Sequence, residues 1–148
     1  MVEEIKVKAV VETENGLPVY STIGAAGCDL KTTINEPYTL KPLERKLFPT
    51  GLHIQLPEGY KAQVTPRSGL ALKHGITVLN TPGLIDEDYT GEIGVILVNL
   101  SDKDFTINPN DRIAQIIFNK YCRADFELVD SLDETERGDG GFGHTGLK

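Results

Sequence analysis

Proline placement constrains the fold of this chain more than any other feature of its sequence. Eight prolines are distributed from Pro18 to Pro109 in a chain of 148 residues, so few stretches can form a helix of several turns. Apolar and polar residues alternate instead in short runs at 5–9, 52–56 and 61–65. Such alternation is typical of strands with one buried face, and we expect strands in all three places.

Two further runs, 95–98 and 113–118, are more continuously apolar, which predicts strands buried on both faces. Short strands separated by proline and glycine indicate an all-β barrel or sandwich. One short helix is expected, with Ser68 as its N-cap, 70–74 as its body and Gly75 as its end.

Composition and charge narrow the class of protein. The chain is 39% apolar and 25% charged, which is ordinary for one globular domain. Its net charge of −7 argues against a nucleic-acid binder, which shows a basic face. No apolar run is long enough for a membrane, and 1–4 has no features of a secretory signal, so we expect an intracellular, cytoplasmic protein. Two distant cysteines and three histidines give no zinc pattern.

The last part of the chain differs in character. Residues 128–136 are acidic, and five of the last eleven residues are glycine, a composition that cannot build a core. We therefore expect a folded domain at 1–130, which the family resemblance given below identifies as a β-barrel catalytic domain, and an acidic linker with a glycine-rich tail at 131–148. A disordered tail is the simplest interpretation. Arg137 and Phe142 favour another, in which the tail closes over a nucleotide and supplies a cation and a stacking ring.

Two short motifs carry groups suited to phosphate chemistry. Residues 66–71 place Arg67 and Ser68 at a strand-to-helix junction, where free N–H groups suit phosphate oxygens. Residues 83–93 have the pattern of a hairpin with an acidic tip, on which Asp86 could activate a water. Each motif also has a structural interpretation, as a helix cap beside a surface arginine and as a solvated loop.

Two more motifs place polar groups in apolar surroundings. Residues 111–115 bring Gln115 into a buried strand, and 25–30 bury or half-bury Asp29 among small residues. Gln115 could equally bond to backbone at the edge of the core, and Asp29 could either hold a hydrated metal or cap a turn.

Taken together and in order, these motifs and the tail resemble the five sequence motifs of the homotrimeric dUTP pyrophosphatase (dUTPase) family. The five segments are 25–30, 66–71, 80–93, 111–115 and 137–146. The resemblance implies a jelly-roll type of distorted β-barrel and a homotrimer with active sites between subunits. It also implies hydrolysis of dUTP to dUMP and pyrophosphate, which limits uracil in DNA and supplies dUMP for thymidylate synthesis.

The resemblance also implies roles for single residues. Asp86 is the general base for a water that attacks the α-phosphorus. Asp29 contacts Mg²⁺ through its water shell, in agreement with the preference of this ion for waters and substrate phosphates. The residues implied to hold the phosphates are Arg67, Ser68, Gly69 and Gln115, together with Arg137 once the tail closes.

Recognition of the base and sugar is implied in the same way. The side chain of Asn80 and the backbone around Gly83, Leu84, Ile85 and Gly94 read uracil. Cytosine would leave buried groups unpaired, a penalty that discriminates strongly. Tyr89 packs under the sugar and excludes a 2′-hydroxyl. The residues that cover the nucleotide from the tail are Phe142, which stacks on uracil, Gly143 and His144.

Two residues depart from the family pattern, and two other functions fit the same scaffold. Cys28 stands where an aromatic residue is frequent, and His144 stands where the tail commonly has serine. The alternative functions are a dCTP deaminase-like enzyme and a catalytically silent nucleotide-binding regulator. The acidic segment favours the pyrophosphatase over the deaminase, and the presence of Asp86, Gln115 and the tail disfavours the regulator.

Overall fold

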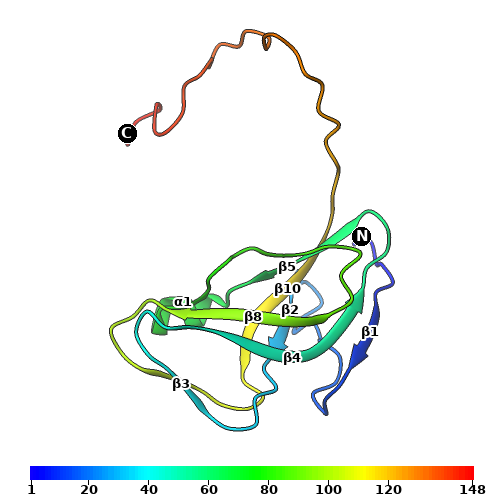
Figure 1. The fold of residues 1–148 in the computed structure, drawn as a ribbon, viewed down its shortest axis with the longest axis vertical. Helices are drawn as coiled ribbons and strands as arrows, with labels where there is room; N and C mark the ends of the chain where they lie inside the picture. Colours follow the sequence, from blue (N-terminus) through cyan, green and yellow to red (C-terminus); the bar gives the residue numbers. More distant parts are fainter.

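Two four-stranded antiparallel sheets form the body of the molecule (Figure 1). The computed structural model describes all 148 residues. Its elements in chain order are β1 (Lys8–Val11), β2 (Cys28–Lys31), β3 (Tyr38–Leu40), β4 (Arg45–Gln55), β5 (Tyr60–Thr65), α1 (Ser68–His74), β6 (Ile76–Val78), β7 (Gly83–Ile85), β8 (Glu92–Asn99), β9 (Phe105–Ile107) and β10 (Arg112–Lys120). The strand order is β1-β4-β8-β6 in the first sheet and β2-β10-β5-β7 in the second, and β3 pairs with β9.

The core is one apolar cluster to which both sheets contribute. Phe48 and Val95 of the first sheet and Ala114 and Ile116 of the second have no exposed surface. Burial of a large apolar side chain contributes about 1.5–3 kcal/mol, so this cluster is the main source of stability. The all-β prediction is confirmed, and so is the one-sided burial predicted in the alternating runs that form the end of β4 and β5.

The prediction of strands buried on both faces holds only in part. In β8, Leu97 and Val98 point to opposite faces and are both buried, but Ile96 is only half-buried. In β10, Gln115 and Ile117 are likewise half-buried. An apolar run therefore does not by itself require that both faces of a strand are covered along its whole length.

The predicted hairpin at 83–93 is also wrong. β7 pairs with β5 in the second sheet, whereas β8 pairs with β4 and β6 in the first. The acidic segment 86–91 therefore connects opposite sheets, and its two flanking strands diverge from each other.

The predicted helix is confirmed with one correction. Gly75 ends α1 in a left-handed conformation with φ of 66°, and its N–H donates to the carbonyl of Ala71 at 3.0 Å. Ser68 is not the N-cap. That position belongs to Arg67, whose backbone is extended, and no side chain caps the first turn. The N–H groups of this turn thus have no capping side chain.

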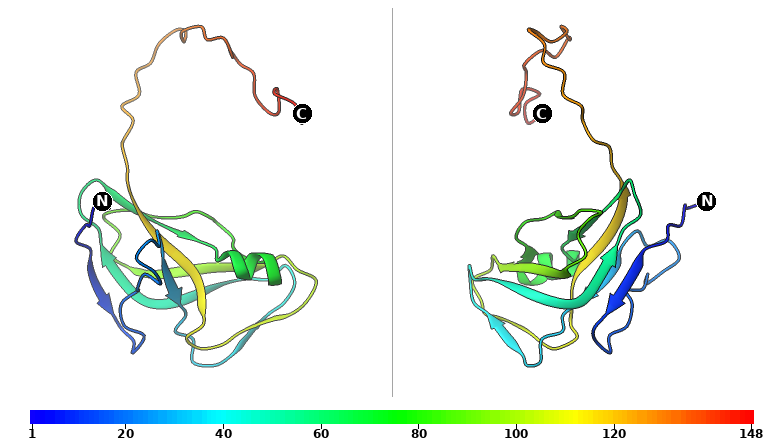
Figure 2. Two further views of the ribbon diagram at one scale, coloured as in Figure 1. Left: turned by 180° about the vertical axis from the view of Figure 1, so that it is seen from behind. Right: turned by 45° about the vertical axis from the view of Figure 1, so that its right-hand side comes forward.

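After Lys120 the chain leaves the barrel as an extended arm, and the two views of Figure 2 show the arm and tail away from both sheets. Residues 121–148 contain no strand or helix. Nowhere in the molecule is a helix both long and apolar enough to cross a membrane.

Candidate active site

A cleft of about 550 Å³ opens where the 86–91 loop passes between the sheets. Its wall combines β7 and the loop on one side with β4 and β8 on the other. Five of the residues expected at a nucleotide site line this cleft, namely Leu84, Ile85, Asp86, Tyr89 and Gly94. The structure thus brings the predicted general base and the predicted base-recognition segment to one place.

Two glycines leave room for the side chains that form the cleft wall. A Cβ at Gly91 would lie 2.6 Å from the ring of Tyr89, and a Cβ at Gly94 would lie 2.6 Å from Leu47 Cδ1. Neither position has room for a side chain without displacement of its neighbour. Tyr89 is held in addition by its hydroxyl, which donates to the carbonyl of Glu92 at 2.8 Å.

The loop is anchored directly after Asp86. The Glu87 carboxylate accepts a hydrogen bond from the N–H of Gly59 at 2.7 Å. Hydrogen bonding to the same carboxylate raises the pKa of Tyr121, which keeps this phenol a neutral donor where the C-terminal arm begins. The loop is therefore tied both to the β4–β5 turn and to the start of the arm.

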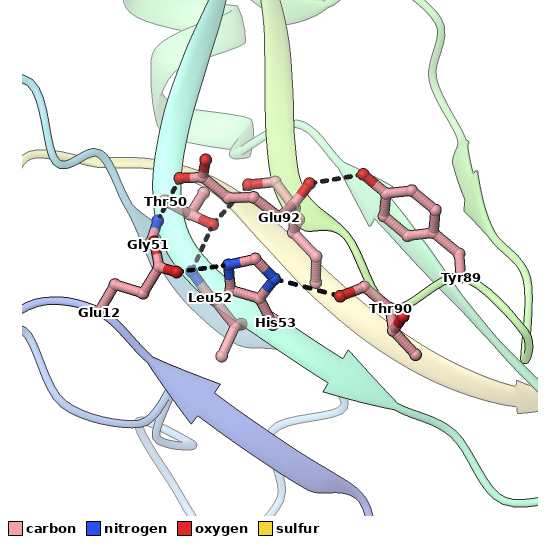
Figure 3. Close-up of polar contacts among 9 residues, drawn as sticks. Glu12, Thr50, Gly51, Leu52, His53, Tyr89, Thr90 and Glu92 are labelled. Atoms are coloured by element: carbon pink, nitrogen blue, oxygen red, sulfur yellow. Dashed lines mark hydrogen bonds and ion pairs between the residues drawn. The ribbon is translucent and has the colours of Figure 1, made fainter.

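Further anchors lie at the other end of the loop (Figure 3). The Glu92 carboxylate accepts from the N–H of Gly51 at 2.8 Å, and the Thr50 hydroxyl donates to the carbonyl of Ile93 at 2.5 Å. Gly51 lies in the irregular part of β4, where the pairing with β8 changes register between Pro49 and His53. This irregularity turns backbone groups of β4 toward the loop.

Asn80 lies beside the cleft residues without lining the cleft itself. Its Nδ2 is 3.4 Å from the place that a Cβ of Gly83 would occupy, so the amide stands over the backbone of β7. An amide there can both donate and accept hydrogen bonds next to the strand that leads into Leu84.

A second group of predicted residues gathers on the second sheet. The pairing of β2, β10 and β5 sets Asp29, Gln115 and Thr65 side by side. The Asp29 carboxylate is 3.5 Å from Arg67 Nε and 3.7 Å from Arg112 Nη1, and Arg67 also donates to the carbonyl of Arg112 at 3.0 Å. The side chain of Asp29 is only 15% exposed, so these partners compensate a largely buried charge.

Cys28 adjoins this group from within the core. Burial raises the pKa of its thiol, which therefore stays neutral beside Asp29. The replacement of an aromatic residue by Cys28 thus adds no charge to the group.

Asp29 does not belong to a closed metal site. Nowhere in the molecule do three or more histidine, cysteine or carboxylate side chains gather as a metal would require. Both oxygens of Asp29 face arginines, so a cation here would contact Asp29 through water and take its other ligands from a substrate, a manner of binding that Mg²⁺ prefers.

The tail residues reach neither group. Arg137 Nε donates to the carbonyl of Gly140 within the tail at 2.7 Å, and Phe142 is fully exposed. In the single chain, the predicted site residues are thus distributed over three places: the cleft, the group around Asp29, and the tail. The cleft lining includes none of Arg67, Ser68, Gly69 or Gln115.

Some functional positions were missed from the sequence. Leu47, Pro49 and Ile96 line the cleft, and His53 contacts the loop next to Tyr89. These residues belong to β4 and β8 and meet the loop only through the fold. The one available signal was Gly51, because a glycine within a strand pattern often marks an irregularity.

Comparison with known proteins identifies the family of this chain. The family model described as dUTPase matches residues 13–146. The chain belongs to the dUTPase family. It is 56% identical over 144 residues to the deoxyuridine 5'-triphosphate nucleotidohydrolase of Fusobacterium nucleatum subsp. nucleatum, covering 97% of this chain and 99% of the relative. The enzyme of the same name from Finegoldia magna is 55% identical over 142 residues, covering 96% and 99%.

Solved dUTPase structures share the fold. The dUTPase of Staphylococcus bacteriophage 80alpha with dUpNHpp has a TM-score of 0.85 at 23% identity, covering 96% of this chain and 99% of that one. A mutant dUTPase from phage phi11 of S. aureus, which shows the coordination of a structural Mg(II) ion, has a TM-score of 0.78 at 21% identity, covering 88% and 100%. The predicted dUTPase type of jelly-roll barrel is thereby confirmed.

Proposed function

We propose that this dUTPase family member hydrolyses dUTP to dUMP and pyrophosphate in a Mg²⁺-dependent reaction. The observation that carries the proposal is the cleft in which Asp86, Tyr89 and the backbone of β7 meet, in a chain more than half identical to two proteins named for this activity. The 80alpha protein solved with dUpNHpp supports a nucleotide of this kind as the ligand.

Asp86 is the proposed general base. Its side chain is exposed at the cleft, and the backbone beside it is held by the next residue, Glu87, whose carboxylate bonds to the N–H of Gly59. The carboxylate accepts a proton from a water that attacks the α-phosphorus. The bond from this phosphorus to the bridging oxygen breaks, and pyrophosphate leaves with both electrons of that bond.

The group around Asp29 is proposed to bind the phosphates. Arg67 keeps part of its guanidinium free of Asp29, and the uncapped N–H groups of Ser68 and Gly69 follow it directly. Gln115 adds an amide from the neighbouring strand. Asp29 would hold a bound Mg²⁺ through water, and the ion would supply neutralisation of the phosphate charge and polarisation of the phosphoryl oxygens.

Base and sugar are proposed to lie in the cleft. Backbone groups of Gly83, Leu84, Ile85 and Gly94, together with the Asn80 amide, pair with the edge of uracil. Tyr89 occupies the space that a 2′-hydroxyl would need, and its fixed ring makes this exclusion strict.

A homotrimer is the proposed assembly, with the tail of one chain closing a site built by others. The separation of the cleft, the Asp29 group and the tail within one chain supports it. So does the half-buried apolar surface of β10 at Ile117 and Phe118, which one chain does not cover. In this assembly the tail at 131–148 supplies Arg137 to the phosphates, Phe142 to the uracil ring, and Gly143 and His144 to the closed lid.

The alternative functions are not favoured. Neither relative is named a dCTP deaminase, and both carry the name of the nucleotidohydrolase. The silent-regulator alternative has no support in the cleft, which retains Asp86 beside intact loop anchors.

Hydrolysis of a panel of dUTP, dCTP, dTTP and UTP, with and without Mg²⁺ and with product identification, tests the proposal. We expect conversion of dUTP alone to dUMP and pyrophosphate, stimulated by Mg²⁺. Release of ammonia from dCTP would instead support the deaminase, and binding of dUTP without turnover would support the regulator.

A further inference from the structure

His53 occupies a bridging position behind the cleft (Figure 3). It lies in β4 opposite Glu92 of β8, and its side chain is 26% exposed. One ring nitrogen, Nδ1, is 3.1 Å from the carbonyl oxygen of Thr90 in the cleft loop. The other, Nε2, is 3.1 Å from Glu12 Oε1 beyond the end of β1, and Glu12 is itself fixed by its N–H, which donates to the carbonyl of Gly51 at 2.9 Å.

The two oxygens that face the ring nitrogens can only accept hydrogen bonds, so a ring nitrogen bonds to its oxygen only when it carries a hydrogen. A neutral imidazole has one N–H and one lone pair, so either tautomer turns a lone pair toward an oxygen about 3.1 Å away. Only the ring protonated on both nitrogens offers a proton to each side. No other protein atom bonds to Nε2, and the contact with Glu12 is close without being well aligned.

The charged groups around the ring are mostly acidic. Glu12 and Lys8 come from β1 and the residue after it, and Glu92 comes from β8 with its carboxylate directed to the N–H of Gly51.

The Thr90 carbonyl links this ring to the cleft. Thr90 stands between Tyr89, which lines the cleft, and Gly91, whose missing side chain makes room for the tyrosine ring. A carbonyl held at this point fixes the backbone from which Tyr89 projects. Thr90 itself makes no other hydrogen bond, so without this contact its carbonyl is held only indirectly, through the anchors at Tyr89 and Glu92.

We propose that His53 is a positioning residue that holds the Thr90 carbonyl through Nδ1 and thereby sets Tyr89 in the wall of the nucleotide cleft. The proposal rests on the proposed dUTP hydrolysis. It predicts that the cleft loosens when the side chain at position 53 can no longer donate to this carbonyl.

Two matched substitutions separate the two contacts. The amide nitrogen of asparagine stands as many bonds from the backbone as His Nδ1, and that of glutamine as many as His Nε2. His53→Asn therefore keeps a donor for Thr90, whereas His53→Gln keeps one only for Glu12. We expect KM for dUTP to stay near the original value in His53→Asn and to rise about three- to tenfold in His53→Gln, with kcat little changed in both.

The difference between these two variants is a readout that a purely structural histidine would not give. Both variants remove the ring and its packing, but only His53→Asn keeps a donor at the place of Nδ1. Equal KM values in the Asn and Gln variants would overturn the proposal.

Amide hydrogen exchange at 89–91 completes the test without reference to turnover. Exchange in His53→Gln should be faster than in His53→Asn, provided that both variants melt as the original chain does. Equal exchange would contradict the proposal even if the chain hydrolysed no dUTP. If the original chain hydrolyses dUTP but the Asn and Gln variants have the same KM and the same exchange rates, only the role of His53 is rejected. The proposed function then stands.

Discussion

The cleft loop at 86–92 and the tail at 137–146 are both rich in turns, glycine and charge, yet the fold treats them in opposite ways. The loop is tied to β4 and to the β4–β5 turn through Glu87, Thr90 and Glu92. The tail bonds only within itself, as Arg137 does to Gly140, and to Thr135 just before it. The cleft is therefore preformed, whereas the tail must pay conformational entropy if it closes over a ligand.

Glycine shows the difference most clearly. At Gly91 and Gly94 neighbouring side chains occupy the space of a Cβ and would have to move to admit one. Around Gly138, Gly141 and Gly143 that space is open. The same residue type thus allows close packing in one region and freedom of the backbone in the other, and composition alone does not separate these uses.

The largest predicted effect concerns the chemistry of the preformed region. Asp86→Asn should lower kcat about 100- to 10,000-fold, because the amide cannot accept the proton of the attacking water. Binding of a non-hydrolysable dUTP analogue, measured by calorimetry, should remain close to that of the original chain. Unchanged turnover would remove Asp86 from its role as the base.

Loss of the tail should have the next largest effect. A chain that ends at Glu136 lacks Arg137 and Phe142, and we expect kcat/KM for dUTP to fall about 100-fold through the loss of phosphate contacts. Its assembly, measured by light scattering, should match that of the full chain, since the tail bonds to no part of the barrel. Dissociation on truncation would instead assign the tail a structural role.

A pair of glycine substitutions compares the two regions by stability. Gly51→Ala forces a side chain into a backbone with φ of 65° and places its Cβ 2.6 Å from Thr13 Cγ2. We expect a loss of about 1–3 kcal/mol in the free energy of unfolding, measured by denaturant titration. Gly138→Ala has a similar φ of 57° but open space, and it should leave the barrel unaffected. Equal losses in both would mean that the tail is held as firmly as the barrel.

The smallest predicted effect is a dependence of folding stability on acidic pH at Glu44, which lies between β3 and β4 and is called the rim of the barrel below. The pKa of Glu44 is lowered by the backbone N–H of Lys41 and by the hydroxyl of Tyr38. A lowered pKa in the folded state means that this contribution is present above the ordinary pKa and is lost as pH falls below it. Glu44→Gln should slightly lower the melting temperature at neutral pH and reduce its fall toward about pH 3.

Glu134→Gln is the matched control, because Glu134 in the tail has no ion pair or hydrogen bond. Its melting curve should follow the original chain at every pH. A change as large as that of Glu44→Gln would contradict the contrast between rim and tail.

The sequence alone predicts the strand-rich fold, the end of α1 at Gly75 and the position of Asp86 on an exposed acidic segment. Local patterns suffice for these features, since alternation, proline spacing and turn glycine act over a few residues. The same patterns misplace the N-cap, because Ser68 has the right chemistry but the backbone of Arg67 adopts the capping conformation.

The pairing of β7 and β8 with different sheets could not be predicted from the segment between them, since a short connection usually joins paired neighbours. Support of the cleft by His53 and Thr50 was invisible for a related reason. These contacts join residues 37 and 43 positions apart, and only the fold makes them neighbours. The loop and the tail have similar compositions, so the sequence did not predict that the barrel anchors the loop and leaves the tail free.

The central claim is that a preformed cleft on one chain is completed by a tail from another, and complementation tests it most directly. Asp86→Asn and the chain ending at Glu136 are each nearly inactive by our account. Co-expressed with different affinity tags and purified for both, they should form mixed assemblies in which the truncated chain supplies Asp86 and the mutated chain supplies the tail. Recovery of a substantial part of the dUTP hydrolysis of the original chain is the predicted result. Mixed assemblies as inactive as their components would show that cleft and tail must belong to the same chain, and would contradict the account.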